Sequence, residues 1–257
     1  MLGAPVVAEL VRRGHDIRVL TRTPPAELQP GSTHHAVDLV TGAGLRDALA
    51  GVDAVIEAAN TLGLGRKAWP VLVDGTRRLL EAEAREEVGH HVAVSIVGID
   101  AVAFAYYEGK LAQERLVEQG PVAWSIVRAT QFHQLLDWVF STTARAHVVP
   151  GNRFAVAPVD PRVVAGVMAD VAEAGPGGRV ATVAGPHAAP LREHALSWAQ
   201  ARARRVLTPA LPLPRRTRRA LATGALVPGD DAITGGPSFR DWLRAPHAPA
   251  MAAACTR

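Results

Sequence analysis

The chain has 257 residues, of which 48% are hydrophobic and 20% are charged, a composition typical of folded globular proteins. The formal net charge is +4, and arginine supplies nearly all of the positive charge. The longest apolar runs hold about eight residues, whereas a membrane-spanning helix needs about 20. A single cysteine, Cys255, excludes a disulfide framework. Because the sequence also opens without the pattern of a secretory signal, we expect a cytoplasmic protein with no membrane partner.

In chain order, segments with helical periodicity alternate with short apolar runs. The spacing predicts helices over residues 4–13, 45–50, 69–85 and 107–118, and strands over 16–21, 36–39, 54–58, 92–97 and 124–128. Strands that are separated by helices at this spacing form βαβ units, which pair in parallel through right-handed crossovers. The first half of the chain is therefore predicted to be an α/β domain with a parallel sheet.

The pattern changes after residue 148. Short strands are expected over 153–158 and 180–184, with helices over 162–173 and 191–205, and the rest is rich in proline and arginine. We therefore predict three parts: a nucleotide-binding domain over 1–148, a smaller substrate-side lobe over 149–222, and an irregular tail over 223–257.

The first expected element is a helix and not a strand. Folds that bind dinucleotides open with a strand, a glycine-rich turn and a helix whose N-terminus holds the pyrophosphate. Here Leu2 and Gly3 directly precede the helical segment, and the strand at 16–21 follows it. We expect a Rossmann-type doubly wound parallel sheet whose first strand and glycine-rich loop are missing from the sequence as given. The alternative, a chain that truly begins at Met1, would leave two long strand edges unpaired and bind a dinucleotide poorly.

Arg22 ends the strand expected at 16–21. In dinucleotide-binding folds an acidic residue near this position holds the ribose hydroxyls of NAD, and a basic residue accommodates the 2′-phosphate of NADP. Arg22 therefore favours NADP, with NAD as the alternative. A surface arginine without a ligand is an equally weighted interpretation in a chain this rich in arginine.

A serine, a tyrosine and a lysine form the strongest candidate for chemistry. Ser95 lies in the apolar strand 92–97, and Tyr106 and Lys110 follow with the spacing of one helical turn. A nearby ammonium would lower the pKa of the tyrosine so that it can act as an acid or base near neutrality. The chain has two tyrosines, both in this segment. Tyr107 is the fallback, and the structural alternative is a tyrosine packed on the sheet beside a solvated lysine.

These features together resemble the NmrA-like, or atypical short-chain dehydrogenase, family of NAD(P)H-binding proteins over about residues 1–222. The resemblance rests on Leu2-Gly3, on residues 18–22, 51–55, 74–80 and 94–98, on Tyr106 to Lys110, on Arg128 to Phe132, and on 158–160.

The resemblance implies roles for further residues. Met1 would occupy the variable position of the family's TGATGxLG fingerprint, followed by Leu2 and Gly3. Asp38 and Leu39 would hold the adenine. Ala58, Ala59 and Asn60 would let the backbone approach the cofactor, Gln131 and Phe132 would lie beside the nicotinamide, and Lys110 would hold its ribose.

In this family some members resemble reductases and others resemble redox sensors. We therefore expect an NADP-preferring reductase of a small carbonyl or quinone substrate, in which Tyr106 donates the proton, Lys110 tunes it and Ser95 orients the acceptor. The alternative is a non-catalytic dinucleotide sensor or scaffold that binds another protein. Whether the chain forms a homodimer or binds a partner protein is left open.

Two histidine pairs and a cluster of arginines are further candidate binding sites. The pairs His34-His35 and His90-His91 are interpreted as loop residues that precede strands, and no metal site is predicted because no carboxylate or cysteine has a ligand spacing. Arginines cluster at positions 202, 204, 205, 215, 216, 218 and 219. The segment between them carries no aromatic residue for stacking, so nucleic acid is disfavoured as a partner and a solvated surface is expected.

Overall fold

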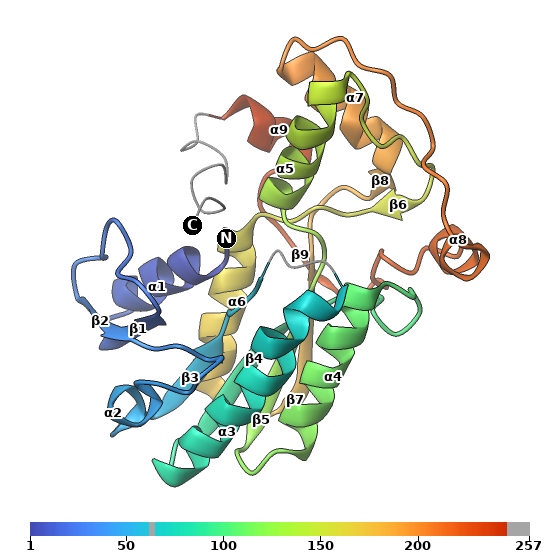
Figure 1. Ribbon diagram of the computed structural model, residues 1–257. Coiled ribbons are helices and arrows are strands. Elements are labelled where there is room, and N and C mark those ends of the chain that lie inside the picture. Colours follow the sequence, from blue (N-terminus) through green and yellow to red (C-terminus); the bar gives the residue numbers. More distant parts are fainter. Residues whose placement is uncertain (62–64, 246–257) are drawn as a thin grey trace.

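The computed structural model describes residues 1–61 and 65–245, and in it helices flank a parallel sheet (Figure 1). The α-helices are α1 (Gly3–Arg12), α2 (Leu45–Leu49), α3 (Thr76–Arg85), α4 (Ala105–Gln119), α5 (His133–Thr143), α6 (Pro161–Ala174), α7 (Leu191–Ala201), α8 (Arg215–Ala222) and α9 (Phe239–Arg244). Short 3₁₀ turns occur at Gly65–Ala68 and Ala144–Ala146, and a π-helical turn, Pro70–Gly75, leads into α3. The strands are β1 (Ile17–Thr21), β2 (Ser32–Ala36), β3 (Ala54–Glu57), β4 (His90–Ile96), β5 (Trp124–Ala129), β6 (Ala155–Val156), β7 (Gly178–Ala184), β8 (Ala189–Pro190) and β9 (Ile233–Thr234).

The main sheet has five parallel strands in the order β3-β4-β5-β7-β9. Two short sheets accompany it, the parallel pair β1-β2 and the antiparallel pair β6-β8. The predicted α/β class, the parallel pairing and the Rossmann-type arrangement of strands and helices are confirmed.

The β1-β2 pair is separate from the main sheet. Within the described residues, β1 pairs with β2 alone and β3 pairs with β4 alone. In a doubly wound sheet of order 3-2-1-4-5-6, β1 and β2 correspond to the second and third strands, and β3 to the fourth. The division therefore falls at the position that the first strand of such a sheet occupies.

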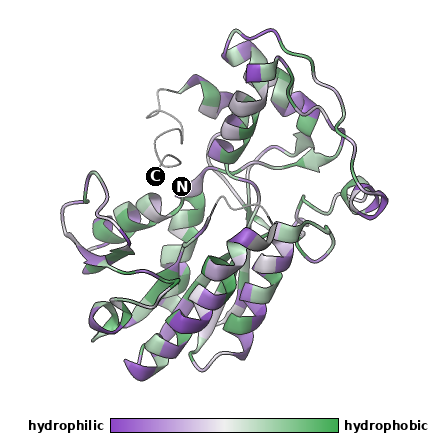
Figure 2. Cartoon of the chain, in the orientation of Figure 1, coloured by the Kyte–Doolittle hydropathy of each residue, from purple (hydrophilic) through white to green (hydrophobic). Residues whose placement is uncertain are grey.

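Helices cover both faces of the main sheet. Successive residues of a strand point to opposite faces, and here apolar residues point to both. Val92 of β4 packs in a cluster with α1 and α6, whereas its neighbour Ala93 packs in a cluster with Leu80 of α3 and Val117 of α4. Figure 2 shows both hydrophilic and hydrophobic residues on α3 and α4, as expected of helices that bury one side on a sheet.

Elements of the C-terminal part join the main sheet and the helices around it. Within 149–222, β7 pairs with β5 in the main sheet, and α6 packs against α1. The tail expected over 223–257 is not irregular in its described part: β9 pairs with β7, and α9 buries Phe239, Trp242 and Leu243. The lobe itself consists of α5, α7 and α9, which lie together above the sheet (Figure 1).

Some element boundaries also differ from the prediction. The second strand lies at Ser32–Ala36 and not at 36–39, and 153–158 holds only the two-residue strand β6. Helices α5 and α8 were not predicted. A helix α5 that packs in the lobe's core depends on apolar partners far away in sequence, which periodicity within one segment does not reveal.

Gly98 joins the sheet to the C-terminal part through a close backbone approach. Its φ is +78°, and a Cβ at this position would lie 1.9 Å from the carbonyl oxygen of Ala225. Gly224 has nearly the same φ, +79°, but a Cβ there would meet nothing within 4 Å. The two glycines thus separate the cost of the backbone conformation from the cost of the close approach.

We predict that Gly98→Ala lowers the free energy of unfolding by about 1–3 kcal/mol more than Gly224→Ala does. Both variants force alanine into a left-handed conformation, and only Gly98→Ala pushes a methyl group into a backbone carbonyl. Urea denaturation followed by circular dichroism measures the difference. Equal destabilisation by the two variants would show that the approach of residue 98 to residue 225 is not tight in solution.

Candidate functional site at the carboxyl edge of the sheet

Side chains from three segments meet where the parallel strands end. Asn60 follows β3, Tyr106 lies in the first turn of α4, and Gln131 follows β5. The hydroxyl of Tyr106 donates a hydrogen bond to Asn60 Oδ1 at 2.8 Å. The ring of Tyr107 lies 6.2 Å from that of Tyr106, and its hydroxyl contacts the Gln131 amide. Ligands of open α/β sheets bind at this edge, so these residues form the candidate site.

The Tyr106 hydroxyl is kept in its protonated form. Burial raises the pKa of Tyr106, and the hydrogen bond to Asn60 offsets only part of this effect. Burial likewise raises the pKa of Tyr107 to about 12. The expectation that Lys110 lowers the pKa of Tyr106 is therefore wrong for this structure. A phenol in this state can donate a proton or a hydrogen bond, and it is a poor base.

Lys110 points into the protein and not toward the tyrosine hydroxyl. Its Nζ donates hydrogen bonds to the carbonyl oxygen of Val94, at 2.7 Å, and to Gln113 Oε1. Burial lowers the pKa of Lys110 to about 8, although Glu57 and Glu114 partly oppose this. The lysine is thus buried, its hydrogen bonds go to groups other than the Tyr106 hydroxyl, and it fixes α4 to β4.

Ser95 is buried in β4, on the side of the sheet that faces α4. Its hydroxyl faces the carboxylate of Glu114, and in the sheet it is paired in register with Arg128, which binds Glu114 at 2.6 Å. Glu114 is eight residues after Tyr106, or about 12 Å further along the helix at 1.5 Å per residue. The hydroxyls of Ser95 and Tyr106 therefore have different polar partners, Glu114 and Asn60.

The residues predicted for phosphate binding lie at one helix end. Leu2 is buried, and Gly3 begins α1, whose first turn has no side-chain cap. A Cβ on Gly3 would meet nothing within 4 Å, so the space beside the first turn is open. Uncapped backbone N–H groups at a helix N-terminus can bind a phosphate group.

The other predicted cofactor residues lie on neighbouring loops. Arg22 is exposed directly after β1. Asp38 accepts a hydrogen bond from the backbone N–H of Val40 and so stabilises its own turn. Leu39 packs close to Gly75, where a Cβ would lie 3.1 Å from that of Leu39.

Ala58 and Ala59 continue from β3 toward Asn60, and Ala58 packs against the core of α1 and α6. Phe132 caps α5 and forms a bridge with Val159. These residues line the same edge of the sheet as Asn60 and Gln131.

A buried network of charged groups lies beneath this edge and was missed in the sequence. His91 was expected in a loop, but it is completely buried in β4, with Nδ1 2.9 Å from Glu83 and Nε2 3.5 Å from Glu57. Burial lowers the pKa of His91, but the nearby carboxylate of Glu57 and the hydrogen-bonded carboxylate of Glu83 outweigh burial and raise it to about 9. The raised pKa favours the protonated imidazole, and burial also raises the pKa of its partner Glu83.

The network continues to Lys110. Thr76 donates a hydrogen bond to Glu57 Oε1 at 2.6 Å and accepts one from Gln113 Nε2 at 3.0 Å. Gln113 in turn accepts from Lys110. A continuous chain of polar contacts thus joins β3, β4, α3 and α4. The sequence signal was available: Glu57 and His91 interrupt apolar strands at inward positions, where a charge requires a partner.

The chain matches the model of a family described as NAD(P)H-binding over residues 1–174. The chain belongs to this NAD(P)H-binding family. Its fold agrees with the match, since the matched region contains the β1-β2 pair, β3 to β5 of the main sheet and the helices around them. No curated protein is similar enough in sequence to count as a relative.

Solved structures share the fold of this NAD(P)H-binding protein at low sequence identity. An NADPH-dependent quinone oxidoreductase from Escherichia coli, in complex with NADPH, has a TM-score of 0.76 and 17% identity over 95% of each chain. A nucleoside-diphosphate-sugar epimerase from Staphylococcus aureus has a TM-score of 0.73 and 14% identity, over 95% of this chain and 96% of the other. An NAD-dependent NDP-hexosamine 5,6-dehydratase of tunicamycin biosynthesis has a TM-score of 0.71 and 16% identity, over 95% and 92%.

The described residues contain no metal-binding cluster and no helix that could span a membrane. Within 1–61 and 65–245, no group of three or more histidine, cysteine, aspartate or glutamate side chains is arranged to hold a metal ion. The helices in the same residues are too short or too polar to span a membrane.

We predict that His91 makes stability depend on pH. Its pKa in the folded protein, about 9, lies above its ordinary value of 6.5. The stabilisation is complete below pH 6.5 and is lost as the pH rises through about 9, by up to about 1.4 kcal/mol per pH unit. The measurement is the difference in unfolding free energy between the natural protein and His91→Gln across this range, which removes the contributions of groups that do not contact His91.

His35→Gln is the matched control, because His35 lies on β2 outside the network. The His91→Gln difference should change with pH by more than the His35→Gln difference does. A His91→Gln difference that stays constant from pH 6.5 to 9 would contradict a protonated His91.

Proposed function

We propose that this NAD(P)H-binding protein is an NADP-preferring reductase of a small carbonyl or quinone substrate. The observation that carries the proposal is the protonated Tyr106 hydroxyl, held by Asn60 at the carboxyl edge of the sheet. A proton donor at this edge is what the reduction of a carbonyl or quinone oxygen requires. The quinone oxidoreductase among the structures of similar fold is consistent with such a substrate.

The residues around the site fit a dinucleotide. The uncapped first turn at Leu2 and Gly3 opens into free space, which suits a pyrophosphate. Arg22 is exposed beyond β1, and within the described residues it has no ion-pair partner. We therefore assign the pyrophosphate to the start of α1 and the 2′-phosphate of NADP to Arg22, with Asp38 and Leu39 toward the adenine.

The protein's part in the reaction is to position the acceptor and to supply a proton. A bound NADPH supplies the hydride for the carbon of the acceptor. Tyr106 gives its hydroxyl proton to the acceptor oxygen and regains one from solvent. Before the acceptor binds, the Tyr106 hydroxyl donates to Asn60 Oδ1, and it turns its proton to the acceptor oxygen when the acceptor is bound. Lys110 contributes by holding α4, and thereby Tyr106, against β4.

We predict that Tyr106→Phe lowers kcat for NADPH-dependent reduction of a quinone or carbonyl about 100-fold or more, since proton donation contributes that much. The affinity for NADPH should change less than twofold. Tyr107→Phe is the control, because the Tyr107 hydroxyl faces Gln131 and not Asn60. Full turnover by Tyr106→Phe would overturn the assignment of the proton donor.

We predict that Arg22→Ala weakens NADPH binding about 10- to 100-fold and leaves NADH binding unchanged. The expected change is that of one charge-assisted hydrogen-bonded contact to a phosphate. Arg205→Ala, at an exposed position in the C-terminal part, serves as the control for loss of one positive charge. Isothermal titration calorimetry of the natural protein and both variants with both dinucleotides gives the six constants. Equal losses for NADPH and NADH would remove the basis for NADP preference.

A second function is favoured by one observation. Ser95 and Lys110 are buried, and their polar partners are Glu114, Val94 and Gln113 instead of the Tyr106 hydroxyl. This arrangement suits a protein that binds the dinucleotide and responds to it without turnover. Such a sensor would bind NADPH stoichiometrically, consume none with any carbonyl or quinone, and respond identically when Tyr106 is replaced by phenylalanine.

A further inference from the structure

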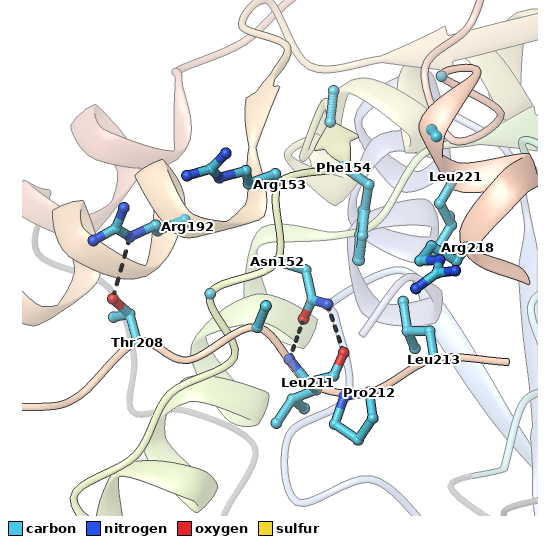
Figure 3. Close-up of a pocket in the computed structure, with 15 residues that line it drawn as sticks. Asn152, Arg153, Phe154, Arg192, Thr208, Leu211, Pro212, Leu213, Arg218 and Leu221 are labelled. Carbon is cyan, nitrogen blue, oxygen red and sulfur yellow. Dashed lines mark hydrogen bonds between the residues drawn. The ribbon is translucent and has the colours of Figure 1, made fainter. Parts of the chain in front are cut away.

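A cleft in the C-terminal part has no role in the site described above. It lies between residues 151–155, Arg192 on α7, and residues 208–224, with a volume of about 780 Å³ (Figure 3). This volume is in the range of clefts that bind small molecules. None of the residues at the carboxyl edge that were assigned to the dinucleotide lines it.

The cleft carries positive charge without compensation. Arg153, Arg192 and Arg218 line it, and no acidic residue does. Figure 3 shows Arg153 and Arg192 on one side and Arg218 on the other. Among the described residues none of these three arginines has a carboxylate partner, whereas Arg128 and Arg179 both bind Glu114.

The space between the arginines is apolar. Phe154, Leu213 and Leu221 contribute to its walls, and Phe154 lies between the two groups of arginines in Figure 3. Phe154 and Leu213 are only partly buried by the protein, and both pack on the core that contains Leu221. The cleft therefore offers an apolar surface flanked by guanidinium groups.

The walls of the cleft are held in place by hydrogen bonds. The Asn152 amide donates to the carbonyl oxygen of Leu211 at 2.9 Å and accepts from the Leu211 N–H at 3.2 Å. The N–H of Gly151 donates to Pro209 O at 2.8 Å, and the Arg192 side chain reaches Thr208 Oγ1 at 3.5 Å. A site that is formed before binding loses less entropy when a ligand enters.

We propose that this cleft binds a small organic anion: an apolar, ring-sized body that carries a phosphate or carboxylate group. The anionic group binds between Arg153 and Arg192, whose planar guanidinium groups suit the oxygens of either anion. The apolar body lies on Phe154, Leu213 and Leu221. The inference is independent of the proposed reductase, because no step of it requires the dinucleotide.

The test is calorimetric titration of the full chain, without dinucleotide, with phenyl phosphate, benzoate, inorganic phosphate and benzyl alcohol. Phenyl phosphate should bind in a 1:1 complex, inorganic phosphate should bind at least tenfold more weakly, and benzyl alcohol should not bind. Comparing phenyl phosphate with benzoate decides which anion is preferred. Binding of benzyl alcohol as tight as that of phenyl phosphate, or no binding of either anion, would overturn the proposal.

Variants locate the binding in the cleft. The double variant Arg153→Gln/Arg192→Gln should weaken phenyl phosphate binding at least tenfold. Arg215→Gln/Arg219→Gln removes the same charge from exposed positions of α8 that do not line the cleft, and should change it less than twofold. Arg153→Lys/Arg192→Lys keeps the charge but loses the planar groups, so its affinity for phenyl phosphate should lie between the affinities of the two glutamine variants. Equal weakening by the two glutamine variants would mean that only the overall charge attracts the anion.

Discussion

The position of His91 between two buried carboxylates is the interaction on which the candidate site depends. Three charged groups in an apolar layer are costly unless each has a partner. Glu57 ends β3, His91 lies in β4 and Glu83 lies in α3, so their ion pairs hold the sheet against the helix layer. Thr76 and Gln113 extend the network to Lys110, which sets the position of α4.

The network explains why the edge above it can hold a polar site. Glu57 ends β3 just before the segment that leads to Asn60, and Lys110 is one helical turn after Tyr106. With both segments anchored from below, Asn60 and the Tyr106 hydroxyl meet at 2.8 Å. From the sequence, Lys110 was expected to change the pKa of Tyr106. In the structure its ammonium group is buried and hydrogen-bonded to Val94 and Gln113, so it holds α4 in place.

Much of the fold could be predicted because its signals are local. Strand β4 contains an apolar run, helices α1 and α3 have a clear period, and alternation of the two types implies parallel pairing. The part after residue 206 could not be predicted in this way. Strand β9 has only two residues and depends on pairing with β7, and α9 is stabilised by packing of Phe239 and Trp242 in the lobe.

By itself, the sequence determined the α/β class, the parallel strands and the segments whose ends form the candidate site, since period and spacing are properties of neighbouring residues. The tertiary structure alone decided which side chains meet. In it the Tyr106 hydroxyl donates a hydrogen bond to Asn60, and Ser95 and Lys110 are buried. It also brought Arg153, Arg192 and Arg218 around one cleft, although 65 residues separate the first from the last in the chain. Contacts between residues far apart in the chain depend on how helices and strands pack, and no local sequence pattern encodes them.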